Sequence, residues 1–148
     1  MNLFNILSIS GSALTAERQR AEIIAANMAN AETTRTEAGG RFRRREVVFR
    51  SPAASAFGLS LASAGNLNKP VAGGVQISEV VDDPSPPVMR YMPGHPDANE
   101  AGYVAFPSIN PALEMVDLMG SVRAYQLNAS AVTASKQMIQ QTIDILKS

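Results

Sequence analysis

The sequence predicts a mainly α protein in which long N- and C-terminal helices form a coiled-coil hairpin around a small irregular β region. Apolar residues at both ends of the chain recur at alternating spacings of three and four, which is the pattern of a heptad seam. The segment between the two ends is rich in Ala, Ser, Gly, Asn and Pro, which are typical of turns and loops. The 148 residues are enough for one domain with its own core.

The first helix is expected over residues 2–30. Gly11 is its one local weakness, at a cost of about 1 kcal/mol relative to alanine. A short apolar run opens the chain, but no basic residues precede it and Glu17 follows soon after, so we do not expect a cleaved signal peptide. The apolar seam of this helix consists of Leu3, Leu7, Leu14, Ala21, Ile24 and Met28, with Ser10 and Glu17 at its weaker positions.

The second helix is expected from Pro111 to Lys147, a length of about 55 Å at 1.5 Å per residue. Asn110 is a suitable N-cap, Pro111 suits the first helical position, and Glu114 favours the positive end of the helix dipole. The seam of this helix consists of Met115, Leu118, Val122, Tyr125, Ala129, Val132, Lys136, Ile139, Ile143 and Leu146.

The lengths of these two segments favour a coiled coil between the termini. A periodic pattern sustained beyond about 25 residues indicates a coiled coil, a membrane span or a helical repeat. Polar residues exclude the span, and no internal repeat is visible. An ordinary helical hairpin within a bundle is the alternative. However, the second helix carries a second apolar row beside its seam, formed by Met119, Leu127, Ala131 and Met138. No segment of the chain is large enough to cover both rows.

The middle of the chain predicts a small β element. We divide the chain into residues 1–36 (first helix and an extended segment), 37–110 (β and loop region) and 111–148 (second helix). Strands are expected at Glu46–Arg50, Val75–Val81 and Val88–Met92, the last two joined by a turn at Asp83-Pro84. Residues 51–74 are expected to form a loop or mobile insert.

His95, the single histidine, is the first candidate for chemistry. A metal site needs two or more ligands and a catalytic histidine needs an orienting partner, yet only carboxylates such as Asp97 accompany it, and the chain has no cysteine. The surrounding Pro93, Gly94 and Pro96 are typical of a turn. We therefore expect a structural loop that redirects the chain from the β region into the C-terminal helix, with no metal, no cofactor and no enzymatic activity. A small metal-dependent hydrolase using His95 and Asp97 is the remote alternative.

A basic cluster formed by Arg41, Arg43, Arg44 and Arg45 is the second candidate. Nucleic-acid binding would require more positive charge and more interleaved aromatic residues than Phe42 alone, and the formal net charge of the chain is zero. We expect a solvated face or a polar contact with a neighbouring protein instead. The sequence also gives no reason to expect direct insertion into a membrane.

Asn27 and Asn30 lie three residues apart near the end of the first helix. Asparagine tolerates the left-handed conformation that ends a helix, and Thr33, Thr34 and Thr36 then favour extended chain. A helix C-terminus is therefore a sufficient explanation for this segment.

Taken together, three segments resemble the flagellar axial proteins, and within that family the FlgC-type proximal rod proteins. They are "SGSALTAERQRAEIIAANMANAETTRT", "GGRFRRREVVF" and "YMPGHPDANEAGYVAFPSINPALEMVDLMGSVRAYQLNASAV". Rod and hook relatives share the first pattern, and the Gly94-His95-Pro96-Asp97 block narrows the resemblance. The residues that match the family motif are Asn27, Asn30, Thr33, Gly94, His95, Pro96, Asp97, Asn99, Gly102 and Tyr103.

The resemblance implies a structural subunit of the flagellar rod, which is part drive shaft and part export channel. Such proteins are exported without a cleaved signal and polymerise in the periplasmic space. The implied partners are other rod proteins, rod-base adaptor and export-gate proteins, and copies of the chain itself. Another axial component of the rod or hook, or a secreted coiled-coil adaptor, is the alternative. The expected helix interface consists of Leu3, Leu7, Leu14, Ile24, Met28, Met115, Leu118, Val122, Tyr125, Val132, Ile139, Ile143 and Leu146.

Overall fold

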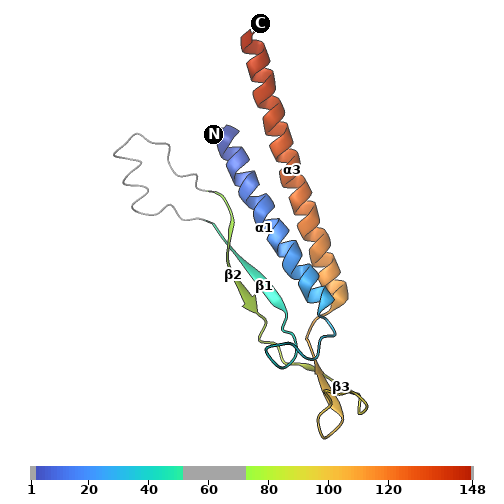
Figure 1. The fold of residues 1–148 in the computed structure, drawn as a ribbon. Coiled ribbons are helices and arrows are strands. Elements are labelled where there is room, and N and C mark those ends of the chain that lie inside the picture. The colour runs from blue at the N-terminus through green and yellow to red at the C-terminus, as the bar shows by residue number, and fades with distance from the viewer. Residues whose placement is uncertain (1–2, 52–72, 148) are drawn as a thin grey trace, which may run out of the picture. The chain divides into compact units, whose positions relative to one another are not determined.

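The computed structural model describes residues 3–51 and 73–147. Its elements follow the order α1 (Leu3–Ala29), β1 (Arg45–Arg50), β2 (Gln76–Asp82), β3 (Val88–Tyr91), β4 (Tyr103–Phe106) and α3 (Pro111–Lys147) (Figure 1). Both predicted terminal helices are confirmed, as is the mainly α class with a small β region between them. Apart from residues 51, 73 and 74, the expected insert at 51–74 lies outside the described residues.

The chain divides into two compact units. The first comprises Met1–Arg18, Phe49–Ser78 and Val122–Ser148, and the second comprises Gln19–Val48 and Glu79–Ser121. Each terminal helix contributes one segment to each unit. The pairing of these helices as a coiled coil remains a prediction, because their apolar seams are only partly buried within the units, as described below.

The β region contains four described strands rather than the three that were expected. The additional strand, β4, pairs antiparallel with β3, with Val88 opposite Phe106 and Tyr91 opposite Tyr103. Its four residues form one short alternation, in which Val104 and Phe106 are buried while Tyr103 is exposed. So short a segment, directly before a helix, gives only a weak strand pattern in the sequence.

The other sheet pairs β1 with β2, so the turn after β2 does not make a hairpin with β3. The turn itself is present at the expected place. The Asp83 carboxylate accepts hydrogen bonds from the backbone N–H of Ser85 at 2.8 Å and from its hydroxyl at 2.6 Å. The backbone N–H of Asp83 donates to the carbonyl of Arg44 at 2.8 Å, which ties this turn to the chain just before β1.

Asn110 caps α3 as the sequence predicts. Its side-chain oxygen accepts a hydrogen bond from the Ala112 N–H at 3.0 Å, and its carbonyl accepts the first helical bond from Glu114 at 3.1 Å. At the other terminal helix, the Asn30 side chain donates to the Ala26 carbonyl at 2.9 Å. The same carbonyl also accepts the backbone N–H of Asn30 at 3.1 Å, so the side chain adds a second hydrogen bond at the end of α1.

Few large apolar side chains are buried within the described residues. The buried apolar side chains are Ala16, Ile24, Val104 and Phe106, and the buried polar ones are Ser10, Asn27, Glu114, Ser121 and Ser135. In the described ranges, neither terminal helix contains a stretch apolar enough to cross a membrane. The buried polar residues therefore require an account, since each needs partners for its polar atoms.

Candidate functional site

The second unit contains a cluster of hydrogen-bonded polar residues that we call the polar junction, formed by Asn27, Arg44, Arg45 and Glu114. Asn27 lies in the last turn of α1, where it is only 1% exposed. Its amide donates to the Arg45 carbonyl at 2.9 Å, and its oxygen accepts from the Arg45 N–H at 2.9 Å. One carboxamide thus satisfies both backbone groups of the first residue of β1.

Glu114 completes the junction from the first turn of α3. One oxygen, Oε2, accepts a hydrogen bond from the Asn27 amide at 3.1 Å, and the other, Oε1, accepts from Nε of Arg44 at 2.5 Å. The Glu114 side chain is 1% exposed, so these two bonds replace the water that a carboxylate would otherwise bind. The sequence suggested only a helix-dipole role for Glu114; the structure adds this buried ion pair.

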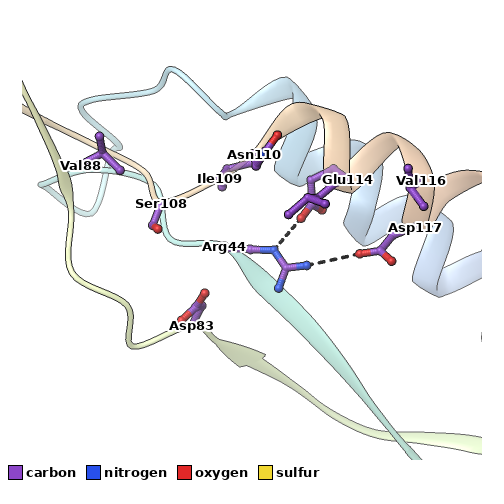
Figure 2. A pocket seen from close by; sticks show the side chains of 10 residues that line it. Arg44, Asp83, Val88, Ser108, Ile109, Asn110, Glu114, Val116 and Asp117 are labelled. Atoms are coloured by element: carbon purple, nitrogen blue, oxygen red, sulfur yellow. Dashed lines mark hydrogen bonds and ion pairs between the residues drawn. The ribbon is translucent and has the colours of Figure 1, made fainter.

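Arg44 lies between several carboxylates. Figure 2 shows its guanidinium reaching toward Glu114 and toward Asp117, whose Oδ2 is 3.6 Å from Nη2. Glu46 forms a third ion pair with it. Burial lowers the pKa of Arg44, but the hydrogen bond and charge of Glu114, together with Glu46, outweigh that and raise the pKa above its ordinary value. Arg44 is therefore charged at every physiological pH.

The polar junction connects three segments that are far apart in the sequence. Asn27 and Arg45 are separated by 18 positions, and Asn27 and Glu114 by 87. Removing one partner of a buried, hydrogen-bonded pair leaves the other without compensation, so the junction requires all its members. Its arrangement holds the end of α1, the start of β1 and the start of α3 together within the second unit.

The remaining motif residues near α1 stabilise the chain after the helix. The Thr33 hydroxyl donates to the Asn30 side-chain oxygen at 3.1 Å, and its N–H donates to the Asn30 carbonyl at 3.1 Å. Thr34 then donates to the Asp97 carboxylate at 2.8 Å. This last bond joins the residue that directly follows the Asn27–Thr33 motif to the Gly94–Tyr103 motif.

The His95 loop connects β3 to β4, whereas we had expected it to lead from the β region into the C-terminal helix. The ring nitrogen Nδ1 of His95 accepts the backbone N–H of Asp97 at 3.1 Å, which is a local turn bond. The Asn99 oxygen accepts from the N–H groups of Ala101 and Tyr103 at 3.0 and 2.9 Å. Among the described residues, no three His, Cys, Asp or Glu side chains are grouped as metal ligands.

Gly102 gives this loop its shape. Its φ of +79° lies in the left-handed region, which favours glycine. A Cβ at this position would come within 2.8 Å of the Tyr91 ring and 3.2 Å of Pro93. Gly94, by contrast, has open space around it and is not in the left-handed region.

The residues expected at a helix interface differ in their burial. On α1, Ile24 is buried and Leu7, Leu14 and Met28 are half-buried. On α3, Leu118, Val132 and Ile139 are half-buried, while the others are exposed: Met115, Val122, Tyr125, Ile143 and Leu146. The side chain of Leu3 is not described. The buried positions of α3 are instead Glu114, Ser121 and Ser135.

A groove of about 560 Å³ lies beside the polar junction, and we call it the acidic groove. It is lined by Arg44, Asp83, Val88, Ser108, Ile109, Asn110, Leu113, Glu114, Val116 and Asp117, most of which are visible in Figure 2. Sequence reasoning missed both the groove and the junction. Arg44 was identified only as part of a basic cluster, and no local spacing links it to residues 70 or more positions away.

Two family models match the chain. The model described as "Flagella basal body rod protein" matches residues 7–35, and "Flagellar basal body rod FlgEFG protein C-terminal" matches residues 100–145. These ranges include Asn27 and Glu114, the two residues of the polar junction that are hydrogen-bonded across the largest separation in the sequence, 87 positions.

Similar proteins match over nearly the full chain. The flagellar basal-body rod protein FlgC of Bacillus subtilis is 37% identical, with 99% of this chain and 100% of the relative covered. The FlgC proteins of Borreliella burgdorferi and Salmonella typhimurium are 32% and 33% identical, and the matches cover 98% or more of each chain. The relatives are structural rod proteins rather than enzymes, which agrees with the interpretation of His95 as a loop residue. The chain therefore belongs to the FlgC-type family of flagellar basal-body rod proteins.

Proposed function

We propose that this rod protein polymerises through its terminal helices, which pack as coiled coils with each other and with those of neighbouring subunits. The polymer would form part of the drive shaft and of its export channel. The observation that carries this proposal is the distribution of side chains on α3. This helix buries small and polar residues and exposes large apolar ones, which is the reverse of the pattern on a helix of an isolated globular protein.

The inward face of α3 follows a seven-residue repeat. Glu114, Ser121 and Ser135 are buried, and Asn128, the remaining member of the series, is half-buried. A strict seven-residue repeat is the pattern of a supercoiled helix pair. Two of its four members, Ser121 and Ser135, are small and allow a neighbouring backbone to approach closely, which supports pairing at this face.

The outward face of α3 carries the apolar surface. Its exposed large side chains are Leu113, Met115, Val116, Met119, Val122, Tyr125, Leu127, Met138, Ile143, Ile145 and Leu146. Large apolar side chains left exposed in this number are typical of a surface that a protein partner covers. Burial of each such side chain by a neighbour would contribute about 1.5 to 3 kcal/mol, so a polymer would gain strongly from covering this face.

We further propose that the chain acts in the periplasmic part of the basal body and reaches it without a cleaved signal peptide. Its partners would be other rod proteins, rod-base adaptor and export-gate proteins, and copies of itself. The names of the relatives support a place in the rod. The absence of cysteine is compatible with export of an unfolded chain, since no disulfide would have to form after assembly.

The test is a charge placed on the outward face of α3. Leu127 is 65% exposed, so Leu127→Asp should leave the monomer folded and exported. In the polymer, each subunit would bury an unpaired carboxylate among apolar groups, so rods should not form and cells should not swim. Val132 and Ile139 are less suitable positions, because both are half-buried within the monomer.

The matched control is Gln126→Asp, which adds the same charge at the adjacent, exposed and already polar position. Swimming on soft agar and the recovery of rods from isolated basal bodies are the measurements. We expect the control to swim. Normal rods in Leu127→Asp cells would contradict the proposed role of this face.

A further inference from the structure

The acidic groove carries more negative than positive charge. Three carboxylates, Asp83, Glu114 and Asp117, line it together with a single guanidinium, that of Arg44. Of the carboxylates that line the groove, Glu114 lies 2.5 Å from Arg44, while Asp117 lies 3.6 Å away with a side chain that is 44% exposed. Asp117 is therefore the carboxylate with the most room for a second cation.

Apolar side chains stand beside these charges. Val88, Leu113 and Val116 line the groove, and Leu113 is 62% exposed. On α3, Leu113 and Asp117 are four residues apart, so they lie on the same side of the helix, one turn from each other. The groove therefore presents an apolar position followed one turn later by an anionic one.

A complementary pair exists further along the same helix. Met119 and Arg123 are also four residues apart, and both are exposed. Arg123 forms no ion pair within the described ranges 3–51 and 73–147. Met119 and Arg123 thus present an apolar position followed one turn later by a cationic one, in the same direction along the helix.

We propose that the acidic groove receives α3 of a second copy of this chain, parallel to the first and displaced by six residues. Arg123 of the second copy then faces Asp117, and Met119 of the second copy faces Leu113. Six residues correspond to an axial displacement of about 9 Å. This inference rests on the proposed function, because it specifies one of the contacts between copies that polymerisation requires.

The two halves of this contact lie on different sides of α3. At 3.6 residues per turn, positions six apart are about 120° apart around the helix axis. A contact that joins two different surfaces is heterologous, so it leaves a free groove on one copy and a free Arg123 on the other. Such a contact propagates from copy to copy and does not stop at a dimer.

Charge favours a second copy over a different protein as the occupant. The groove needs a cation next to an apolar side chain at helical spacing, and this chain offers that pair on an exposed helix in the required order. If a different rod subunit occupied the groove, Asp117 of one copy and Arg123 of the next would not form an ion pair. The experiment below distinguishes these two cases.

Cysteine cross-linking tests the register directly, because the natural chain contains no cysteine. The double variant Asp117→Cys with Arg123→Cys is introduced as the only copy of this protein in a host strain, and assembled basal bodies are oxidised. Within one helix, these positions are about 9 Å apart along the axis, beyond the Cα separation of about 7 Å that a disulfide tolerates. Any disulfide must therefore join two copies.

We expect a ladder of cross-linked species at multiples of the 15.7 kDa chain, lost on reduction. Each single-cysteine variant should give no ladder. The control pair Asp117→Cys with Gln140→Cys should also give none, since Gln140 is exposed on another side of α3 and lies 17 residues beyond Arg123. Assembled rods without a ladder in the Asp117/Arg123 pair would overturn the inference while leaving the proposed function intact.

A charge exchange covers the case in which the cysteine variant fails to assemble. Asp117→Arg and Arg123→Asp should each reduce swimming, because each places two like charges at the contact. The double exchange restores opposite charges between copies, and it should swim further than either single variant. A double variant no better than the poorer single one would refute the pairing, whatever the result with Leu127→Asp.

Discussion

Replacing Asn27 with alanine tests the polar junction most directly. The change removes three hydrogen bonds, two to the backbone of Arg45 and one to the buried carboxylate of Glu114. Each bond to Arg45 is part-buried and contributes about 1 kcal/mol, whereas a bond to a charged group contributes about 1.5 to 3 kcal/mol. Alanine also has the better helix propensity, which returns roughly 0.5 kcal/mol.

The expected net loss is therefore about 3 to 4.5 kcal/mol in the free energy of unfolding. For a chain of this length, that corresponds to a fall in Tm of roughly 10 to 15 °C. Urea unfolding of the purified protein, followed by circular dichroism, measures the first quantity, and thermal unfolding measures the second. The matched control is Asn128→Ala, because that side chain donates a local hydrogen bond to the Ala124 carbonyl at 2.9 Å.

A second pair of variants separates the hydrogen bond from simple loss of packing. Asn27→Asp keeps the shape but removes both donated bonds and places a carboxylate against Glu114, so it should be less stable than Asn27→Ala at neutral pH. Adding Glu114→Gln to that variant supplies a donor and removes the repulsion, so part of the stability should return. If Asn27→Ala costs no more than Asn128→Ala, or if Glu114→Gln only adds a further loss, the account of the junction is wrong.

Two further predictions concern turns. Gly102→Ala should lower the free energy of unfolding by about 1 to 2 kcal/mol because of its positive φ and the crowding by Tyr91 and Pro93, while Gly94→Ala in the same loop should cost far less in the same urea titration. The second prediction concerns the pH dependence of stability at Asp83. Hydrogen bonds from the Ser85 hydroxyl and, next, from the Ser85 N–H hold the pKa of Asp83 below its ordinary value. These bonds therefore stabilise the folded state above about pH 4, and the stabilisation is lost as the pH falls through the folded-state pKa. Asp83→Asn should therefore be less stable than the natural chain at pH 7, with a difference that shrinks on acidification; an equal difference at all pH values would contradict this.

The sequence by itself determined the features that depend on neighbours within one or two turns. The limits of both helices, the Asn110 cap, the turn at Asp83 and the loop character of the His95 segment all follow from local periodicity and local hydrogen bonding. The family also followed from the sequence, because its motif residues are read directly from their order in the chain.

Only the tertiary structure decided which distant segments meet. It paired β1 with β2 and β3 with β4, and it joined Asn27 to Glu114 across 87 positions. It also placed Glu114 and Ser121 inward on α3, one position before the large residues Met115 and Val122 that the apolar pattern had favoured. The physical reason is that periodicity predicts the apolar stripe of a helix but not which other segment packs against the helix, or on which side. Close packing against a neighbouring segment favours small and hydrogen-bonded residues at the contact. The larger apolar residues then remain on the outside, where other surfaces can cover them.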